Sequence, residues 1–121
     1  KFLSQPRNKH LAAARRVLQY LKGTKPHGII YKHNIITGIV SYSDANFAPL
    51  DEPKSRSTTG QIITLGGSTV CWLSKLQTLT ALSTTNAEMV ALCDTAADSV
   101  WLKNLVTELG LPTSCHLYWE W

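Results

Sequence analysis

The sequence predicts an α/β or α+β layer fold in which helices pack on a sheet. Three observations support this prediction: an amphipathic helical period near the N-terminus, β-rich runs joined by a glycine turn in the middle, and a long helical segment that leads into a further strand. The chain has 121 residues and 44% hydrophobic content, which is enough for one domain with a single core.

The first predicted helix runs from about Lys9 to Lys22 and ends at Gly23. Apolar side chains recur at helical spacing along it, namely Leu11, Ala14, Leu18 and Leu21. Residues 1–25 contain no acid, and their basic residues are Lys1, Arg7, Lys9, Arg15, Arg16, Lys22 and Lys25. This basic segment fits a polyanion partner through phosphate neutralisation, and an ordinary solvated helix face accounts for it as well.

Several strands are predicted between the two helices. A short strand is expected from Gly28 to Tyr31 and a longer one from Gly38 to Asp44, in which every second side chain shares a face. The polar stretch from Pro49 to Ser57 has the composition of an exposed loop. Runs from Gly60 to Leu65 and from Thr69 to Leu73, separated by two glycines and a serine, indicate a tight hairpin.

The longest predicted helix extends from Ser83 to Leu109, and Gly110 and Pro112 end it. Its expected apolar side consists of Ala87, Val90, Leu92, Ala96, Val100, Trp101, Leu105 and Leu109. A last strand is expected from His116 to Trp119.

Composition disfavours several classes of protein. No apolar run reaches the roughly 18 residues that a membrane span requires, so no membrane partner is expected. Cys71, Cys93 and Cys115 lack the spacing of a disulfide framework or a zinc site and are expected to be buried free thiols. The histidines show no metal-binding spacing and no G-x-S-x-G motif occurs, which disfavours a serine hydrolase.

Acidic residues are the candidates for divalent-metal binding, because Mg²⁺ prefers oxygen ligands and phosphodiester hydrolysis uses several carboxylates around two ions. Asp44 ends a strand beside apolar neighbours, where a metal would satisfy its charge; opening a turn is its alternative role. Glu88 lies three residues after Thr85, the spacing of a capping box, yet it shares a helical face aimed toward a sheet. Glu120 lies between two tryptophans on the last strand.

Five stretches match, in order, the motifs of one known family. HLAAARRVLQYLKGT at 10–24 resembles a helix that leads into RYLKGT, VSYSDANFA at 40–48 resembles GYSDADWA, and KSRSTTG at 54–60 resembles RKSTSG. LGGSTVCWLSKLQ at 65–77 resembles LGGGPISWSSKKQ, and ALSTTNAEMVAL at 81–92 is similar to ALSSTEAEYIAL. The chain thus resembles the end of the reverse transcriptase connection and the ribonuclease H domain of copia-type LTR retrotransposon Pol polyproteins.

The resemblance implies a ribonuclease H-like α/β fold: a mixed sheet with antiparallel hairpin strands, a long crossover helix and a truncated C-terminal part. It implies a basic connection helix over 1–25 and an incomplete ribonuclease H-like domain over 26–121.

The resemblance also implies a site. It assigns metal binding and catalysis to Asp44, Glu88 and Glu120, with two Mg²⁺ or Mn²⁺ ions in the complete family site. Asn86 stands where the family has a Glu, Glu120 stands where it has an Asp, and the family's fourth acid has no counterpart here.

An RNA–DNA hybrid is the implied partner, together with the remainder of the Pol polyprotein, and no small-molecule cofactor is expected. The expected phosphate contacts are Lys54, Arg56, Arg15 and Arg16. The protein is expected inside the cell, in a cytoplasmic particle or the nucleus where the element is expressed. Two hypotheses stay open: a ribonuclease H that is inactive as this fragment, or a decayed remnant that acts at most as a non-catalytic nucleic-acid-binding or interaction module.

Overall fold

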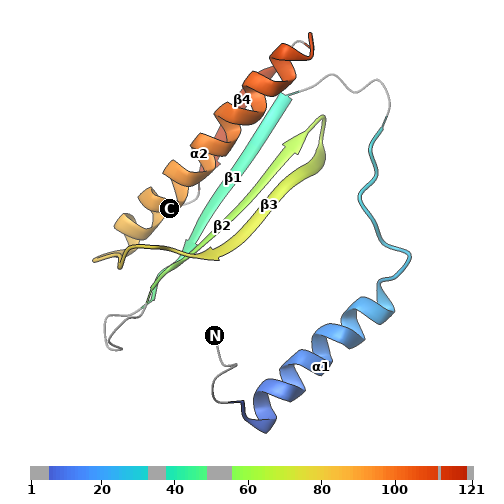
Figure 1. The fold of residues 1–121 in the computed structure, drawn as a ribbon, viewed down its shortest axis with the longest axis vertical. Helices are drawn as coiled ribbons and strands as arrows, with labels where there is room; N and C mark the ends of the chain where they lie inside the picture. The colour runs from blue at the N-terminus through green and yellow to red at the C-terminus, as the bar shows by residue number, and fades with distance from the viewer. Residues whose placement is uncertain (1–5, 33–37, 49–55, 112, 120–121) are drawn as a thin grey trace. The chain divides into compact units, whose positions relative to one another are not determined.

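The computed structural model describes residues 6–32, 38–48, 56–111 and 113–119, which belong to two units (Figure 1). The unit Lys1–Ile30 contains helix α1 (Asn8–Gly23). The unit Tyr31–Trp121 contains a four-stranded sheet and helix α2 (Thr84–Glu108). The described part of the chain is therefore a small α/β protein with two helices and one mixed sheet.

The sheet has the strand order β3-β2-β1-β4. Its strands are β1 (Gly38–Asn46), β2 (Thr58–Leu65), β3 (Ser68–Leu76) and β4 (Ser114–Trp119). β1 pairs antiparallel with β2 and β2 with β3, whereas β4 runs parallel to β1. A parallel pair needs a long crossover connection, and α2 supplies it. The predicted order of helix, antiparallel strands, long helix and strand is confirmed.

A two-glycine turn joins β2 to β3. Gly66 and Gly67 have φ angles of 59° and 77°, the left-handed values that a tight hairpin turn requires and that glycine adopts without steric cost. The register between the two strands shifts after Ile63, which adds a bulge near the turn. The predicted hairpin is confirmed, with β3 three residues longer at its C-terminal end.

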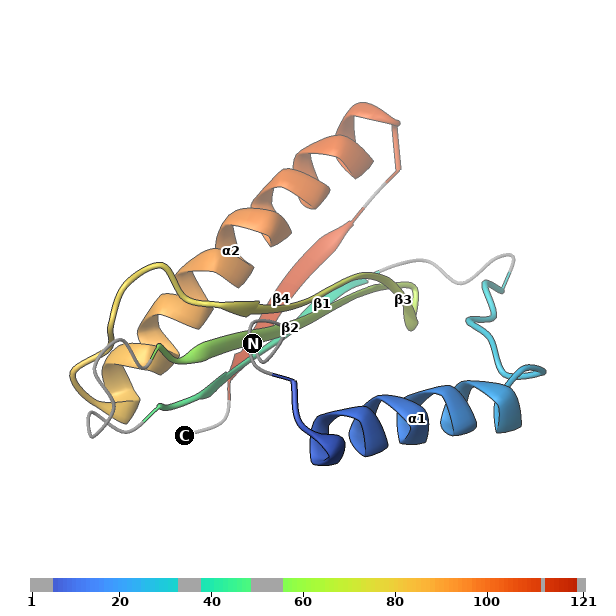
Figure 2. The same cartoon turned by 60° about the horizontal axis from the view of Figure 1, so that its bottom comes forward.

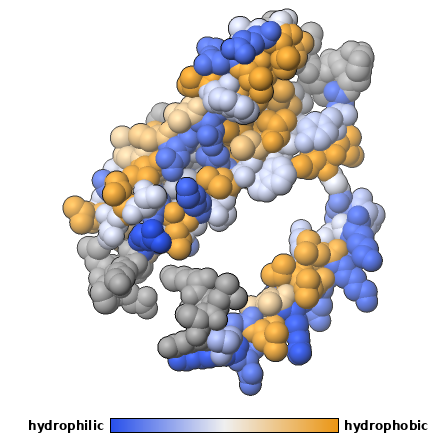
Figure 3. Space-filling model, viewed as in Figure 1, coloured by the Kyte–Doolittle hydropathy of each residue, from blue (hydrophilic) through white to orange (hydrophobic). Residues whose placement is uncertain are grey.

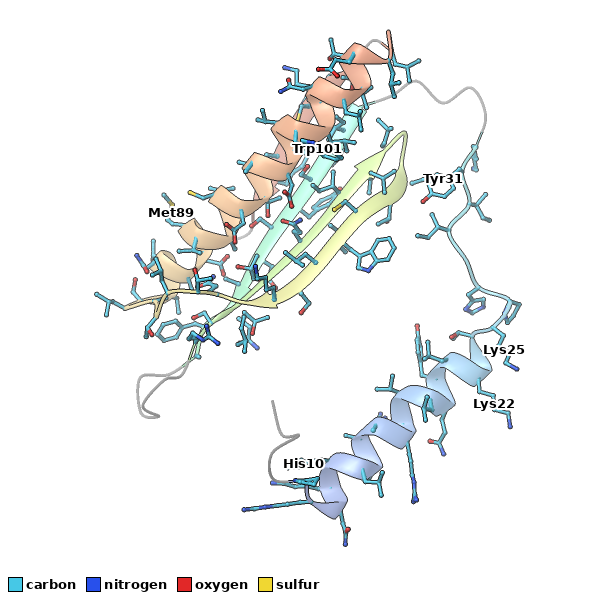
Figure 4. All side chains as sticks on the ribbon, in the orientation of Figure 1. His10, Lys22, Lys25, Tyr31, Met89 and Trp101 are labelled. Carbon is cyan, nitrogen blue, oxygen red and sulfur yellow. The ribbon has the colours of Figure 1, made fainter. Side chains whose placement is uncertain are left out.

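The strand predicted from Gly28 to Tyr31 is wrong, because these residues belong to no strand. Ile29 and Tyr31 are largely exposed, and the Tyr31 hydroxyl donates a hydrogen bond of 2.9 Å to the carbonyl of Thr69 beside the hairpin turn (Figure 4). A β-branched run forms a strand only where a neighbouring strand offers it backbone partners, so local preference was insufficient here.

Helix α2 lies along one face of the sheet and contacts β1, β2 and β4 (Figure 2). Its buried side chains are mostly small or polar, and they are Ala87, Ala91, Thr95, Ser99, Leu102 and Val106. Of the predicted apolar side only Ala87 is buried, whereas Val100 is 55% and Trp101 65% exposed. Met89 also projects outward (Figure 4). Apolar residues surround this helix, so periodicity did not identify the face that small residues bring close to the sheet.

The predicted N-terminal helix is confirmed as α1, but none of its residues is buried. Leu11, Leu18 and Leu21 are each more than half exposed, so its apolar positions lie at the surface together with its basic ones (Figure 3). In the part of the chain that the structure describes, no helix is long and apolar enough to cross a membrane.

The apolar core lies between the C-terminal half of α2 and the sheet. Ile39, Ile63, Leu102 and Val106 form a buried cluster, against which Leu65, Val70, Cys71 and Cys115 pack. All three cysteines are free, but their predicted burial is wrong: Cys71 and Cys115 are half-buried, and Cys93 is exposed on the outer side of α2.

Two neighbouring isoleucines test this core. Ile63 is 1% exposed and Ile62, on the other face of β2, is 47% exposed. We expect Ile63→Ala to lower the free energy of unfolding by ~2–4 kcal/mol, because it leaves a cavity, and Ile62→Ala to change it by less than ~0.5 kcal/mol. Urea unfolding followed by circular dichroism measures both. Equal losses would contradict the assignment of the two faces.

Candidate functional site

Asp44 lies on β1, two residues before the strand ends at Asn46. Its side chain is exposed on the face of the sheet opposite α2, which it shares with Tyr42. Its register partner on β2 is Gly60, which has no side chain. The predicted alternation of faces is confirmed, but Asp44 does not open a turn, because the strand continues past it.

Glu88 lies on α2 within its second turn. The capping box predicted for Thr85 and Glu88 is wrong, because Ser83 is the N-cap residue and its hydroxyl accepts a hydrogen bond of 3.1 Å from the Asn86 amide. The helix thus begins two residues earlier than that pattern assumed, and Thr85 lies inside it. Glu88 is half-buried, beside the buried residue Ala87.

Glu88 reaches the end of β1 from the side of α2, whereas Asp44 points to the opposite face of the sheet. The Glu88 carboxylate accepts a hydrogen bond from the backbone amide of Ala45, the residue after Asp44. Burial raises the pKa of Glu88, the negative charge of Asp44 raises it further, and the Ala45 amide opposes both effects. One carboxylate from β1 and one from α2 therefore lie close enough to repel each other.

Hydrogen bonds from the sheet hold the N-terminal part of α2 in place. The Gln77 side-chain amide donates a hydrogen bond of 2.8 Å to the carbonyl of Ala87 and one of 3.2 Å to the Thr59 hydroxyl. Because Ala87 precedes Glu88, this contact fixes the turn that carries the acid. Sequence analysis missed Gln77, although a polar residue directly after a β-rich run was the available signal.

A buried polar layer continues along α2. The Ser41 and Ser99 hydroxyls form a hydrogen bond of 2.7 Å, and the Gln61 side-chain amide donates one of 2.6 Å to the Asp98 carboxylate. The Thr95 hydroxyl donates a hydrogen bond of 3.3 Å to the side-chain oxygen of Gln61 and one of 2.8 Å to the backbone carbonyl of Ala91. These residues also escaped sequence analysis, because serine and threonine in strands and helices are usually exposed.

The remaining predicted site residues do not join the pair in the described structure. Glu120 and Lys54 lie outside the described residues. Arg56 is exposed just before β2, and Arg15 and Arg16 are exposed on α1. Over residues 6–32, 38–48, 56–111 and 113–119, no three histidines, cysteines or acids gather into a metal-binding group.

The chain is similar to parts of several curated proteins. It is 38% identical over 111 residues to the retrovirus-related Pol polyprotein from transposon RE1 of Arabidopsis thaliana, and 38% identical over 113 residues to that from transposon TNT 1-94 of Nicotiana tabacum. Each match covers 92% of this chain. The chain is thus homologous, over most of its length, to a region of copia-type retrotransposon Pol polyproteins.

This Pol-related chain spans 8% of the length of each of those two polyproteins. It is also 39% identical over 102 residues to a Plasmopara viticola protein named secreted RxLR effector protein 161, and it covers 71% of that protein. No protein-family model and no solved structure matches the Pol-related chain.

The raised pKa of Glu88 has a consequence for stability. An acid whose pKa is raised by folding stabilises the fold fully below its ordinary pKa of 4.5, and this contribution is lost as the pH rises through the folded-state value. We therefore expect Glu88→Gln to increase the free energy of unfolding at pH 7 by at most ~1 kcal/mol and to change it little near pH 4. Thermal unfolding at both pH values measures this.

Asp94→Asn is the matched control, because Asp94 is an exposed acid of the same helix. It should have the same small effect at both pH values. A stabilisation by Glu88→Gln that is as large near pH 4 as at pH 7 would rule out charge as its cause.

Proposed function

We propose that the chain is the ribonuclease H part of a copia-type Pol polyprotein and that Asp44 and Glu88 are ligands of a divalent cation. The observation that carries this proposal is that the Glu88 carboxylate lies at the end of β1, against the Ala45 amide and within range of the negative charge of Asp44. The order of a strand, a hairpin, a long crossover helix and a parallel strand supports a ribonuclease H-like arrangement.

The donor set fits Mg²⁺ or Mn²⁺ in its chemistry. Both ligands are carboxylates, the hard oxygen donors that these ions prefer, and a bound cation would offset their mutual repulsion. When bound, the cation supplies an activated water and charge stabilisation for phosphodiester hydrolysis. The Ala45 amide orients Glu88, and the exposure of Asp44 leaves access for a substrate.

The proposed substrate of the whole Pol polyprotein is the RNA strand of an RNA–DNA hybrid. Arg15, Arg16, Arg56 and Lys54 would contact its phosphates, which position a nucleic acid without reading its sequence. Because the described residues place no third acid beside Asp44 and Glu88, we propose that this chain alone binds the cation but hydrolyses the hybrid poorly.

Metal binding tests the acid pair directly. We expect Asp44→Asn and Glu88→Gln each to weaken Mn²⁺ binding at least ~10-fold, because removing one charged ligand costs more than ~1.4 kcal/mol. Electron paramagnetic resonance of free Mn²⁺ measures the affinity, and Asp94→Asn is the control. Any Mg²⁺-dependent cleavage of a labelled hybrid by the chain must also vanish in Asp44→Asn. Cleavage or Mn²⁺ affinity that both substitutions leave unchanged would refute the proposal.

A non-catalytic nucleic-acid-binding module is the second candidate function. Residues 1–25 contain no acid and seven basic residues, which favours binding to a polyanion whether or not the chain hydrolyses it. Binding to the hybrid together with a Mn²⁺ affinity that does not depend on Asp44 and Glu88 would favour this module over the nuclease.

Salt dependence tests the basic helix. We expect the double substitution Arg15→Gln and Arg16→Gln to reduce the slope of log affinity against log salt concentration by roughly two, because each arginine that neutralises a phosphate adds about one to that slope. Fluorescence anisotropy with a labelled hybrid at several salt concentrations measures the slope. Lys103→Gln, an exposed cation on α2, is the control. An unchanged slope would remove α1 from the nucleic-acid interface.

A further inference from the structure

Gln77 connects the sheet to the turn of α2 that carries Glu88. It directly follows β3, and its side chain is 3% exposed. The side-chain amide donates to the backbone carbonyl of Ala87, the residue before Glu88, and to the hydroxyl of Thr59, which is 1% exposed. One buried side chain of the sheet therefore holds the backbone from which Glu88 extends.

Gln77 is also connected to the end of β1, the strand that carries Asp44. Its backbone amide donates a hydrogen bond of 2.8 Å to the carbonyl of Ser57, just before β2. The Ser57 hydroxyl in turn accepts a hydrogen bond of 3.2 Å from the amide of Ala48, two residues after the end of β1. Ser57 is 1% exposed, and shielding from water strengthens its hydrogen bonds. A chain of hydrogen bonds thus runs from the end of β1 through Ser57 and Gln77 to α2.

We propose that this chain of hydrogen bonds sets the separation between Asp44 and Glu88 and so determines how tightly the two acids bind a divalent cation. We call it the Gln77 clamp, and it consists of Gln77, Ser57 and Thr59. Gln77 is a positioning residue, because it acts through the backbone of α2. This inference rests on the proposed function, which assigns the two acids as the ligands. Neighbours that orient metal ligands typically contribute about 10- to 100-fold to metal affinity.

The positions of the two acids explain why such a clamp matters. Asp44 points to the face of the sheet opposite α2, whereas Glu88 belongs to α2 itself, so their separation depends on where the helix lies relative to the end of β1. The Ala45 amide donates to the Glu88 carboxylate, but a glutamate side chain is flexible, and this bond alone does not fix the helix backbone. The bond from Gln77 ends on a backbone carbonyl and therefore does.

Stability alone is a poor explanation for Gln77. Its side-chain oxygen is buried and has no partner among the described residues, and such an atom costs free energy. Methionine has a similar shape and avoids this cost, while the Ala87 carbonyl keeps its hydrogen bond inside the helix. Gln77→Met is therefore expected to change the unfolding midpoint little and the position of α2 more.

The full chain without metal tests the clamp through the backbone amide of Ala45, whose proton resonance depends on its hydrogen bond to Glu88. We expect Gln77→Met to move this resonance, in two-dimensional NMR spectra, most of the way to its position in Glu88→Ala, where the bond is absent. Mn²⁺ affinity, measured by electron paramagnetic resonance, should fall about 10-fold. Ser57→Ala, which removes the contact with Ala48, should change both readouts in the same direction by a smaller amount.

Gln61→Met is the matched control. Gln61 is also a buried glutamine that bonds to α2, but its partners Thr95 and Asp98 lie farther along the helix. It should leave the Ala45 resonance and the Mn²⁺ affinity unchanged. Equal changes in the Gln61 and Gln77 variants would overturn the inference in favour of a general loosening under α2.

A folded Gln77→Met protein in which neither readout changes would also overturn the inference, and circular dichroism verifies the folding. If Gln77→Met does not fold, Ser57→Ala decides by the same two readouts, and unchanged values there would overturn the clamp.

Failure of the acid pair gives a different result. If substitution of the two acids leaves Mn²⁺ affinity unchanged while Gln77→Met still shifts the Ala45 resonance, the metal site is wrong and the clamp stands as a support of Glu88. If Mn²⁺ affinity depends on both acids but not on Gln77, the metal site stands and the clamp does not determine its affinity.

Discussion

The position of Glu88 depends on how closely α2 approaches the sheet. Ala87, Ala91, Thr95 and Ser99 form the contact side of the N-terminal two thirds of this helix. Such short side chains bring the helix backbone near the strands, and the Gln77 amide then reaches the carbonyl of Ala87. A stripe of leucines at these positions would move the helix away from the sheet and separate Glu88 from the end of β1.

This contact divides the sheet unit into two ends with different energetics. The end around Ile39, Ile63, Leu102 and Val106 is apolar and supplies the hydrophobic stabilisation. The other end is held by hydrogen bonds, whose net contribution is small unless every buried group is paired. Two buried atoms there, the Ser43 hydroxyl and the Gln77 carbonyl oxygen, have no partner among the described residues. The acid pair therefore lies at the end that gains less from burial.

Sequence periodicity predicted the strands of the sheet and the sheet face on which Asp44 lies. Alternating side chains and a two-glycine turn specify a hairpin from short stretches of sequence. Periodicity failed for α2, where apolar residues surround the helix and only the sheet decides which face is buried. It also failed at Gly28–Tyr31, since strand formation depends on a neighbour. The pairing of Asp44 with Glu88 came from the family resemblance, because no local pattern relates a strand residue to a helix residue far along the chain.

One strand links both faces of the sheet. Along β1, Ser41 and Ser43 point into the polar layer under α2, whereas Tyr42 and Asp44 point to the open face. A slip of one residue in the register of β1 would exchange these sets, so that Asp44 entered the buried layer and Ser43 the open face. Charge burial opposes this slip, and pairing with β2 on one side and β4 on the other fixes the register twice. The same alternation that keeps the two serines under the helix thus keeps Asp44 and Tyr42 together on the accessible side.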